Sequence, residues 1–115
     1  MAYILIVDSQ VEFRQQLVRL LEQAGHRATA VALVSEATSL LQAEVPDLLA
    51  TDVVLTDGSS TSLLQQAEAA GANTLIMTGN PDRMIEFDGA GQPYLSKPFL
   101  ADLFVQPVRE MLSSD

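Results

Sequence analysis

The sequence predicts one α/β domain built on a parallel sheet of five strands. Three observations lead to this prediction: short apolar runs alternate with segments of helical period, glycine or proline ends most segments, and a polar residue follows most of the apolar runs. A chain of 115 residues, 48% of them hydrophobic, has the usual size of one domain and enough apolar material for one core. We therefore expect residues 1–115 to form a single domain.

The first apolar run, Tyr3–Val7, has the unbroken hydrophobicity of a strand that is covered on both faces, and it stops at Asp8. From Phe13 onward, apolar residues recur at helical spacing along one face. Gly25 follows this helix at the position where a residue of left-handed conformation commonly ends one. The start of the chain therefore predicts a strand and then a helix.

The next two units are shorter. Residues 28–34 predict a strand that is weak because it is rich in alanine, and a helix follows from Ser35, an expected N-cap, to Gln42. Pro46 prevents continuation of that helix, and Leu48–Thr51 then predicts a buried strand that ends at Asp52.

The second half of the chain repeats the alternation. Residues 56–59 have the composition of a turn, and the helix expected over 63–70 is closed by Gly71. Residues 74–77 predict a fourth strand, after which residues 79–92 leave room for only a short or irregular fourth helix.

A short fifth strand is expected over residues 93–96, with a turn at Lys97 and Pro98. A last helix is expected over 100–112, and Pro107 should kink or break it.

Charge and cysteine content exclude several classes of function. With 15 Asp and Glu against 6 Lys and Arg, the net charge is −9, which argues against binding of nucleic acid or of an anionic membrane surface by this chain. The absence of cysteine excludes a disulfide scaffold, a thiolate nucleophile and a cysteine-bound metal. The N-terminal segment lacks the features of a signal peptide, so we expect a cytoplasmic protein.

Polar residues with related chemistry follow four of the predicted strands: Asp8, Asp52, Thr78 and Lys97. In an open parallel sheet, ligands bind outside the carboxyl ends of the strands, so these side chains are the candidate site. Two neighbouring carboxylates repel each other unless a cation such as Mg²⁺ lies between them. An aspartate can accept a phosphoryl group, whose oxygens a metal, a lysine and a hydroxyl would stabilise.

Four short stretches of the sequence resemble, in their order and spacing, the receiver domain of two-component response regulators. The resemblance extends along nearly the whole chain. The matching stretches are residues 4–8, 46–52, 75–78 and 94–99, together with Arg14 and the turn at Asp57 and Gly58. The resemblance implies a flavodoxin-like doubly wound sheet with strand order 2-1-3-4-5. It also implies a signalling domain that is not an enzyme.

The same resemblance assigns the site residues. It makes Asp52 the phosphoacceptor, Lys97 the phosphate-contacting lysine, and Thr78 and Tyr94 the switch residues. Asp8, Asp52 and the backbone carbonyl of Val54 would bind Mg²⁺. The implied partners are a histidine kinase or phosphotransfer protein and a downstream effector protein or domain.

One departure from the family concerns the metal. The family has two adjacent acids after the first strand, whereas Asp8 is followed here by Ser9. A neutral hydroxyl is a poorer ligand than a carboxylate for a hard cation, so we expect weak Mg²⁺ binding.

Two other functions stay open at this stage. A divergent pseudo-receiver would keep the fold and act as an interaction module without phosphorylation, which Ser9 and the short fourth segment favour. A small flavin or nucleotide binder of the same fold is disfavoured because no phosphate-cradling glycine loop is present in the sequence. Taken alone, Asp8 would be a turn or capping residue, as we expect for Asp47 and Asp57, and His26 would be a surface residue.

Overall fold

The computed structural model describes residues 2–52, 54–55, 57–78, 94–96, 108–110 and 112. Its centre is a five-stranded parallel sheet with the order β2-β1-β3-β6-β7. This order confirms the predicted topology 2-1-3-4-5. The strands of the sheet are β1 (Tyr3–Val7), β2 (Arg27–Val31), β3 (Leu48–Asp52), β6 (Asn73–Thr78) and β7 (Tyr94–Ser96).

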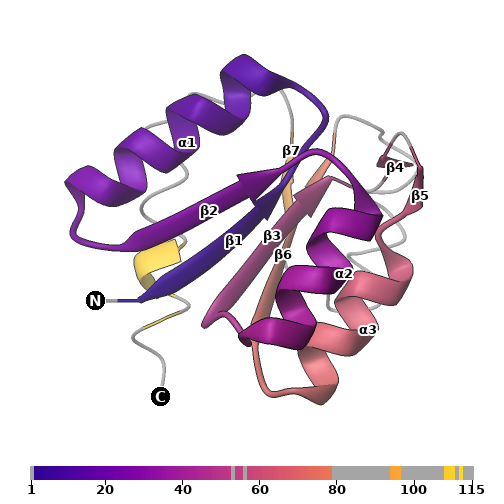
Figure 1. Ribbon diagram of the computed structural model, residues 1–115. Coiled ribbons are helices and arrows are strands. Elements are labelled where there is room, and N and C mark those ends of the chain that lie inside the picture. The colour runs from indigo at the N-terminus through magenta and orange to yellow at the C-terminus, as the bar shows by residue number, and fades with distance from the viewer. Residues whose placement is uncertain are drawn as a thin grey trace.

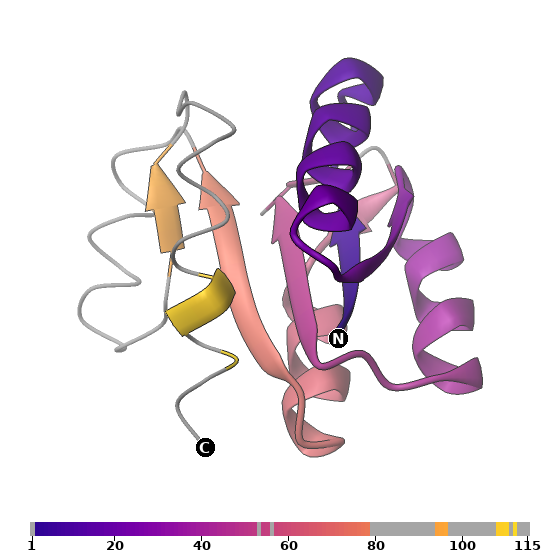
Figure 2. The same ribbon diagram turned by 90° about the vertical axis from the view of Figure 1, so that its left-hand side faces the viewer.

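Helices cover both faces of this sheet, as a doubly wound fold requires (Figures 1 and 2). Helix α1 (Val11–Gln23) lies on one face, together with the short helical segment at 108–110. Helices α2 (Val34–Ala43) and α3 (Thr61–Ala69) lie on the other face. The strands therefore need apolar residues in an unbroken run, and all five residues of β1 are buried.

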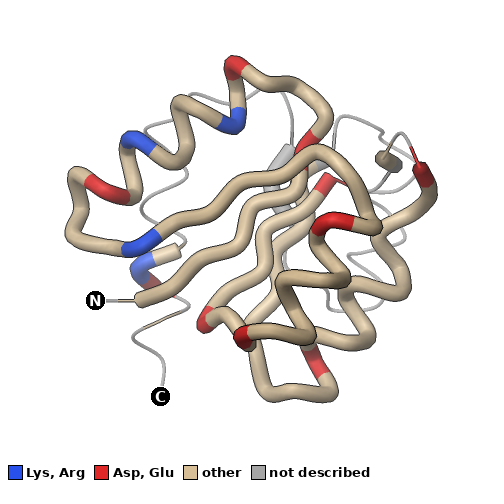
Figure 3. Tube along the Cα trace, viewed as in Figure 1, with Lys and Arg blue, Asp and Glu red and all other residues tan. Residues whose placement is uncertain are grey.

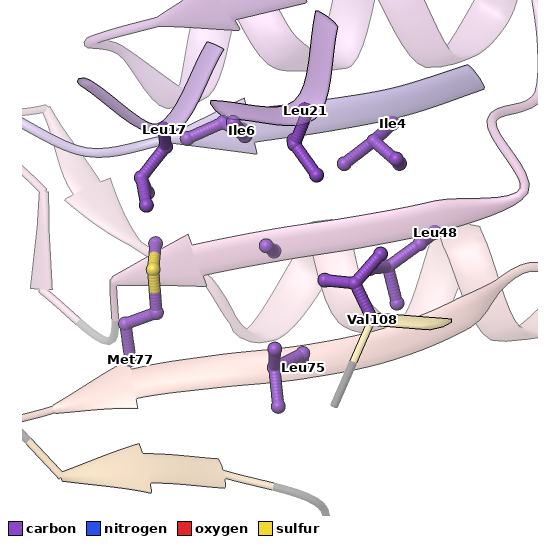
Figure 4. Packing of buried hydrophobic residues seen from close by; sticks show 9 residues of the cluster. Ile4, Ile6, Leu17, Leu21, Leu48, Leu75, Met77 and Val108 are labelled. Carbon is purple, nitrogen blue, oxygen red and sulfur yellow. The ribbon is translucent and has the colours of Figure 1, made fainter. Parts of the chain in front are cut away.

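Each face has its own hydrophobic cluster, because successive residues of a strand point to opposite sides. On the α1 face, Leu17 and Leu21 pack on alternate residues of the sheet, and Val108 of the C-terminal segment joins them (Figure 4). On the α2 and α3 face, the cluster consists of Leu5, Val7, Ala37, Leu41, Leu49, Leu55, Leu63 and Ala67. Full burial of one leucine contributes about 1.5–3 kcal/mol, so these two layers supply most of the stabilisation.

Helices α1 and α3 end in the same way. At the end of α1, the amide of His26 donates to the carbonyl of Leu21 (2.9 Å) and the amide of Gly25 donates to that of Glu22 (3.0 Å). Gly25 has φ +90°, the left-handed conformation that the predicted terminator requires. Gly71 ends α3 with φ +91° and an equivalent pair of bonds. Both glycine predictions are confirmed.

Several predicted boundaries are wrong at the start of the two longest helices and of the second strand. Helix α1 begins at Val11 instead of Phe13, and β2 covers Arg27–Val31 instead of 28–34. Helix α2 begins at Val34, so Ser35 lies within the helix and is not its N-cap. For α2 the reason is tertiary, because the amides of Val34 and Ser35 find their acceptor in Asp57, which lies in a distant loop.

The predicted turn at residues 56–59 is part of a small hairpin that sequence patterns do not predict. Strands β4 (Val54–Leu55) and β5 (Gly58–Ser59) pair in antiparallel fashion, apart from the main sheet. Its two-residue strands are too short to show a period in the sequence. Helix α3 then starts at Thr61, before the expected residue 63.

The fourth and fifth strands and the end of the chain agree with expectation where they are described. The predicted strands at 74–77 and 93–96 are confirmed as β6 and β7, with small shifts of their ends. Residues 108–110 and 112 are helical, within the predicted last helix. The expected short fourth helix and Pro107 lie outside the described residues.

At the amino edge of the sheet, Asp47 has a larger role than that of a turn residue. Its carboxylate accepts a hydrogen bond from the amide of Tyr3 (2.7 Å), and its own amide donates to the Tyr3 carbonyl (2.8 Å). The carbonyl of Asp47 accepts from the amide of Asn73 (3.1 Å). His26, which was predicted to be a surface residue, is partly exposed, and its Nδ1 accepts from the amide of Ala2 (3.3 Å).

Candidate functional site at the carboxyl edge of the sheet

The register of the strands brings the predicted acidic residues together. Val7 of β1 lies beside Thr51 of β3, so the residues that come next, Asp8 and Asp52, meet at the carboxyl edge on neighbouring strands. Figure 3 shows acidic (red) segments of the tube at this edge of the sheet, where β1 and β3 end. The two carboxylates therefore come from strands that are far apart in sequence and adjacent in the sheet.

The pairing of β6 with β7 gives the backbone positions of two further predicted site residues. Thr78 is the last residue of β6 and lies beside Ser96, the last residue of β7. Tyr94 lies in β7 beside Ile76, one strand further from the acids. The backbone positions of Thr78 and Tyr94 are described but their side chains are not, and Lys97 lies outside the described residues.

Asp8 is completely buried, and hydrogen bonds hold both its backbone and its side chain. Its Oδ1 accepts from the amide of Gln10 (2.9 Å), which closes a tight turn into α1. Its amide donates to the carbonyl of Val31 (3.1 Å). Asp8 is thus the turn residue that its position alone suggests, and it also lies at the candidate site.

Arg14 anchors this turn from the first helix. Its Nη1 donates to the backbone carbonyl of Asp8 at 2.7 Å, and the side chain is half-buried. A charged donor makes a strong hydrogen bond, so Arg14 restrains the position of Asp8. This role of Arg14 could not be predicted from the sequence, because a contact between a side chain and a backbone carbonyl leaves no spacing signal.

Asp52 is half-buried at the end of β3, beside the completely buried Thr51. The hydroxyl of Thr51 donates to the backbone carbonyl of Asp52 at 2.9 Å. This bond gives a buried hydroxyl its partner and restrains the backbone where β3 passes into the next loop. Thr51 is a second residue that the sequence did not single out.

Asp57 lies in the turn between β4 and β5 and caps the start of α2. Its Oδ1 accepts from the amide of Val34 (2.7 Å) and its Oδ2 from that of Ser35 (3.1 Å). The hydrogen bond from the Val34 amide is the main reason that the pKa of the Asp57 carboxyl lies below its ordinary value of 3.8. Desolvation opposes this effect, and the hydrogen bond from Ser35 adds to it. Asp57 is therefore a turn residue, as expected, and it also makes a tertiary contact with α2 that was not expected.

The donor set at this edge suits a hard divalent cation. Asp8 and Asp52 offer carboxylate oxygens, and the backbone of Val54 follows in β4 with a carbonyl oxygen. Mg²⁺ is typically bound by one or two carboxylates, with water in its other positions. No group of three or more His, Cys, Asp or Glu side chains forms a cluster among the residues described, in keeping with Ser9 in place of a second acid.

A separate hollow of about 580 Å³ lies at the opposite, amino edge of the sheet. Its lining includes His26, Asp47 and Asn73, which already bond to neighbouring backbone groups. The hollow shares none of its lining with the acidic edge. In the part of the chain described, no helix has the length and apolar character needed to cross a bilayer.

Comparison with known proteins gives this arrangement a family. The family model of the response regulator receiver domain matches residues 4–109. The chain belongs to the response regulator receiver family. Receiver domains are signalling modules, and they generally bind Mg²⁺ at their acidic site.

Individual response regulators resemble the chain over nearly its full length. The swarming motility regulation protein RssB of Serratia marcescens is 30% identical over 111 residues, which cover 92% of this chain and 51% of that protein. The probable transcriptional regulatory protein TcrX of Mycobacterium tuberculosis is 26% identical over 114 residues, 95% of this chain and 49% of that protein. The chain thus spans about half the length of these curated relatives.

Solved receiver structures share the fold. A putative response regulator from Chloroflexus aurantiacus superposes with a TM-score of 0.83 at 27% identity, covering 97% of this chain and 98% of that one. A two-component response regulator from Clostridium difficile has a TM-score of 0.86 at 22% identity, covering 99% and 98% of the two chains. The flavodoxin-like receiver fold is therefore confirmed. Response regulators interact with histidine kinases and with effectors.

Proposed function

We propose that the chain is a single receiver domain whose Asp52 accepts a phosphoryl group from a histidine kinase or phosphotransfer protein in the cytoplasm. The observation that supports this proposal is the register that brings Asp8 and Asp52 to adjacent strand ends at the carboxyl edge. An oxygen of the Asp52 carboxylate attacks phosphorus, the O–P bond forms and the P–N bond of the phosphohistidine breaks. The electron pair of the broken bond returns to the imidazole nitrogen.

The other residues have proposed roles in stabilising the negative charge of the phosphoryl group. Asp8, Asp52 and the carbonyl of Val54 would hold Mg²⁺, which when bound offsets the negative charge of the phosphoryl oxygens. Lys97 would contact a phosphoryl oxygen, and Thr78 would donate to another. Thr78 and Tyr94 would then change position and alter the surface that a downstream effector protein or domain recognises.

Beryllofluoride with Mg²⁺, a mimic of an aspartyl phosphate, tests the acceptor. We expect it to shift the amide resonances of Thr78 and Tyr94 in the wild type and to have no effect on Asp52→Asn. Asp47→Asn is the matched control, because it removes the same charge at the opposite edge of the sheet and should respond like the wild type. An equal response of Asp52→Asn would contradict the proposal. No response of the wild type in millimolar Mg²⁺ would favour the pseudo-receiver.

We also propose that Ser9 makes the Mg²⁺ affinity low. Ser9 is exposed beside the buried Asp8 and brings no charge to the site. Ser9→Asp should strengthen Mg²⁺ binding about tenfold, which corresponds to about 1.4 kcal/mol. Ser9→Asn, of similar size to Asp and uncharged, should stay near the wild type. The measurement is a Mg²⁺ titration followed by amide shifts, and micromolar binding by the wild type would overturn the idea.

A further inference from the structure

The first turn of α2 depends on a residue that belongs to another part of the chain. Its N-cap residue, Leu33, makes no side-chain hydrogen bond to the helix. The open amides of Val34 and Ser35 donate instead to the two carboxylate oxygens of Asp57, which lies 23 and 22 residues away. Asp57 thus does for α2 what a local capping residue does for most helices.

Asp57 also lies in the loop that carries a predicted metal ligand. Val54 pairs with Ser59, and Leu55 pairs with Gly58, so Asp57 occupies the turn of the hairpin that starts just beyond Asp52. The same loop packs on the helix, because a Cβ atom at Gly58 would lie 3.8 Å from Cγ2 of Val34. Leu55, on the hairpin, is buried in the cluster that includes Leu41 of α2.

We propose that Asp57 is a positioning residue that couples the Mg²⁺ site to the first turn of α2. The inference rests on the proposed function only in taking the Val54 carbonyl as a metal ligand. Asp57 fastens one end of the hairpin to α2, while β3 fastens the other, so the carbonyl of Val54 is held in place before a cation arrives. A ligand group that is already ordered binds with a smaller loss of conformational entropy.

Coupling of this kind acts in both directions. If the bond between Asp57 and α2 strengthens Mg²⁺ binding, Mg²⁺ must strengthen that bond by the same factor. A cap with a purely structural role would stabilise α2 and leave cation affinity unchanged. The two possibilities therefore differ in a measurable way.

The experiment compares Asp57→Ala with Glu36→Ala, using Mg²⁺ alone as the probe. Glu36 is the matched control, because it is an exposed acid in the first turn of the same helix and its carboxylate accepts from the amide of Ala32 (3.4 Å). Affinity is followed by the amide shifts of Thr51 and Asp52, and capping by hydrogen exchange of the Val34 and Ser35 amides.

We expect Asp57→Ala to weaken Mg²⁺ binding about fivefold and Glu36→Ala to change it less than twofold. Saturating Mg²⁺ should slow exchange at Val34 and Ser35 about fivefold in the wild type and in Glu36→Ala. Asp57→Ala should exchange these amides about fivefold faster and show no protection by Mg²⁺. Asp57→Asn, which keeps one acceptor oxygen, should lie between wild type and Asp57→Ala.

Equal Mg²⁺ affinity in wild type and Asp57→Ala would overturn the coupling and leave the phosphoacceptor proposal intact. Protection of Val34 and Ser35 by Mg²⁺ in Asp57→Ala would overturn it as well. Absence of any Mg²⁺-dependent shift at Thr51 and Asp52 in the wild type would show that Mg²⁺ does not bind there. That result would overturn this inference as well. Phosphoryl transfer to Asp52 is measured separately, so the two failures are distinguishable.

Discussion

Asp8 and Asp57 illustrate how differently two acids near one edge of a sheet are held. Asp8 is buried completely, and its carboxylate accepts the amide of Gln10 within a tight turn. Burial of a carboxylate is costly unless hydrogen bonds or a cation compensate it, so such a residue is suited to a metal site. Asp57 is exposed, and it contributes through two backbone amides that have no other acceptor in the helix.

The pH dependence of stability should report the Asp57 cap. Its folded-state pKa lies below 3.8, chiefly because the Val34 amide donates to the carboxylate. A depressed pKa contributes stability that is fully present above the unfolded value of 3.8 and is lost as pH falls through the folded value. The wild type should therefore exceed Asp57→Asn in stability by a constant margin above about pH 5, and the margin should shrink below pH 3.8.

Urea unfolding at constant ionic strength from neutral pH to below the Asp57 pKa measures this margin. The comparison with Asp57→Asn cancels the titration of the acids that the substitution does not affect. A margin that is the same at all pH values would contradict the cap.

At the scale of the element, two kinds of helix end occur in the same fold. Helices α1 and α3 each carry their own terminator, a glycine of positive φ that local hydrogen bonds hold. At the start of α2, in contrast, the amides of Val34 and Ser35 depend on Asp57 of the hairpin. The first kind of end can be predicted from sequence because all its parts are neighbours in the chain.

Gly71 offers a direct test of the local device. Nothing lies within 4 Å of a Cβ atom at this position, so the penalty for a side chain is conformational and not steric crowding by neighbours. Gly71→Ala should lower the free energy of unfolding by about 1–2 kcal/mol, the cost of the left-handed conformation. Gly71→Asn should lose less free energy of unfolding than Gly71→Ala, because asparagine adopts the left-handed conformation more readily than alanine.

The measurement is the denaturant midpoint of the three proteins. Equal midpoints for wild type and Gly71→Ala would contradict the prediction, because the helix end could then change conformation without loss of stability.

At the scale of the whole molecule, charge is unevenly distributed. Figure 3 shows basic segments on α1 and at the start of β2, whereas the described parts of α2 and α3 carry acidic segments only. Arg27 accounts for one of the basic segments, and it is paired with Glu44 and lies over the Tyr3 ring at 4.1 Å from its centre. The hydrogen bond to Glu44 raises the pKa of Arg27.

A net charge of −9 should make stability depend on salt. The Debye length falls from about 30 Å at 0.01 M to about 10 Å at 0.1 M, which screens repulsion across the molecule. We expect the Tm to rise between 10 and 200 mM NaCl, a range chosen to span about that change in Debye length. Choline chloride is the control, because screening should give the same rise with either cation. A rise with NaCl alone would indicate specific binding of sodium instead.

The sequence by itself determined the fold class, the strand order through its family resemblance, and the identity of the acids at the carboxyl edge. These features depend on residues close together in the chain: apolar runs such as Tyr3–Val7, and the polar residues that end them. Register follows from the burial of both faces of the sheet, because a shift by one residue would turn every side chain to the other face.

The tertiary structure alone decided which distant groups complete these elements. Arg14 reaches the carbonyl of Asp8, and Asp57 caps a helix that begins 23 residues earlier. A backbone amide or carbonyl that is left unpaired needs a hydrogen-bond partner, but the partner can come from any part of the chain. Proteins with the same pattern of strands and helices can therefore use different residues for it. The start of α2 was therefore predicted incorrectly, while the strand ends that bring Asp8 and Asp52 together were predicted correctly.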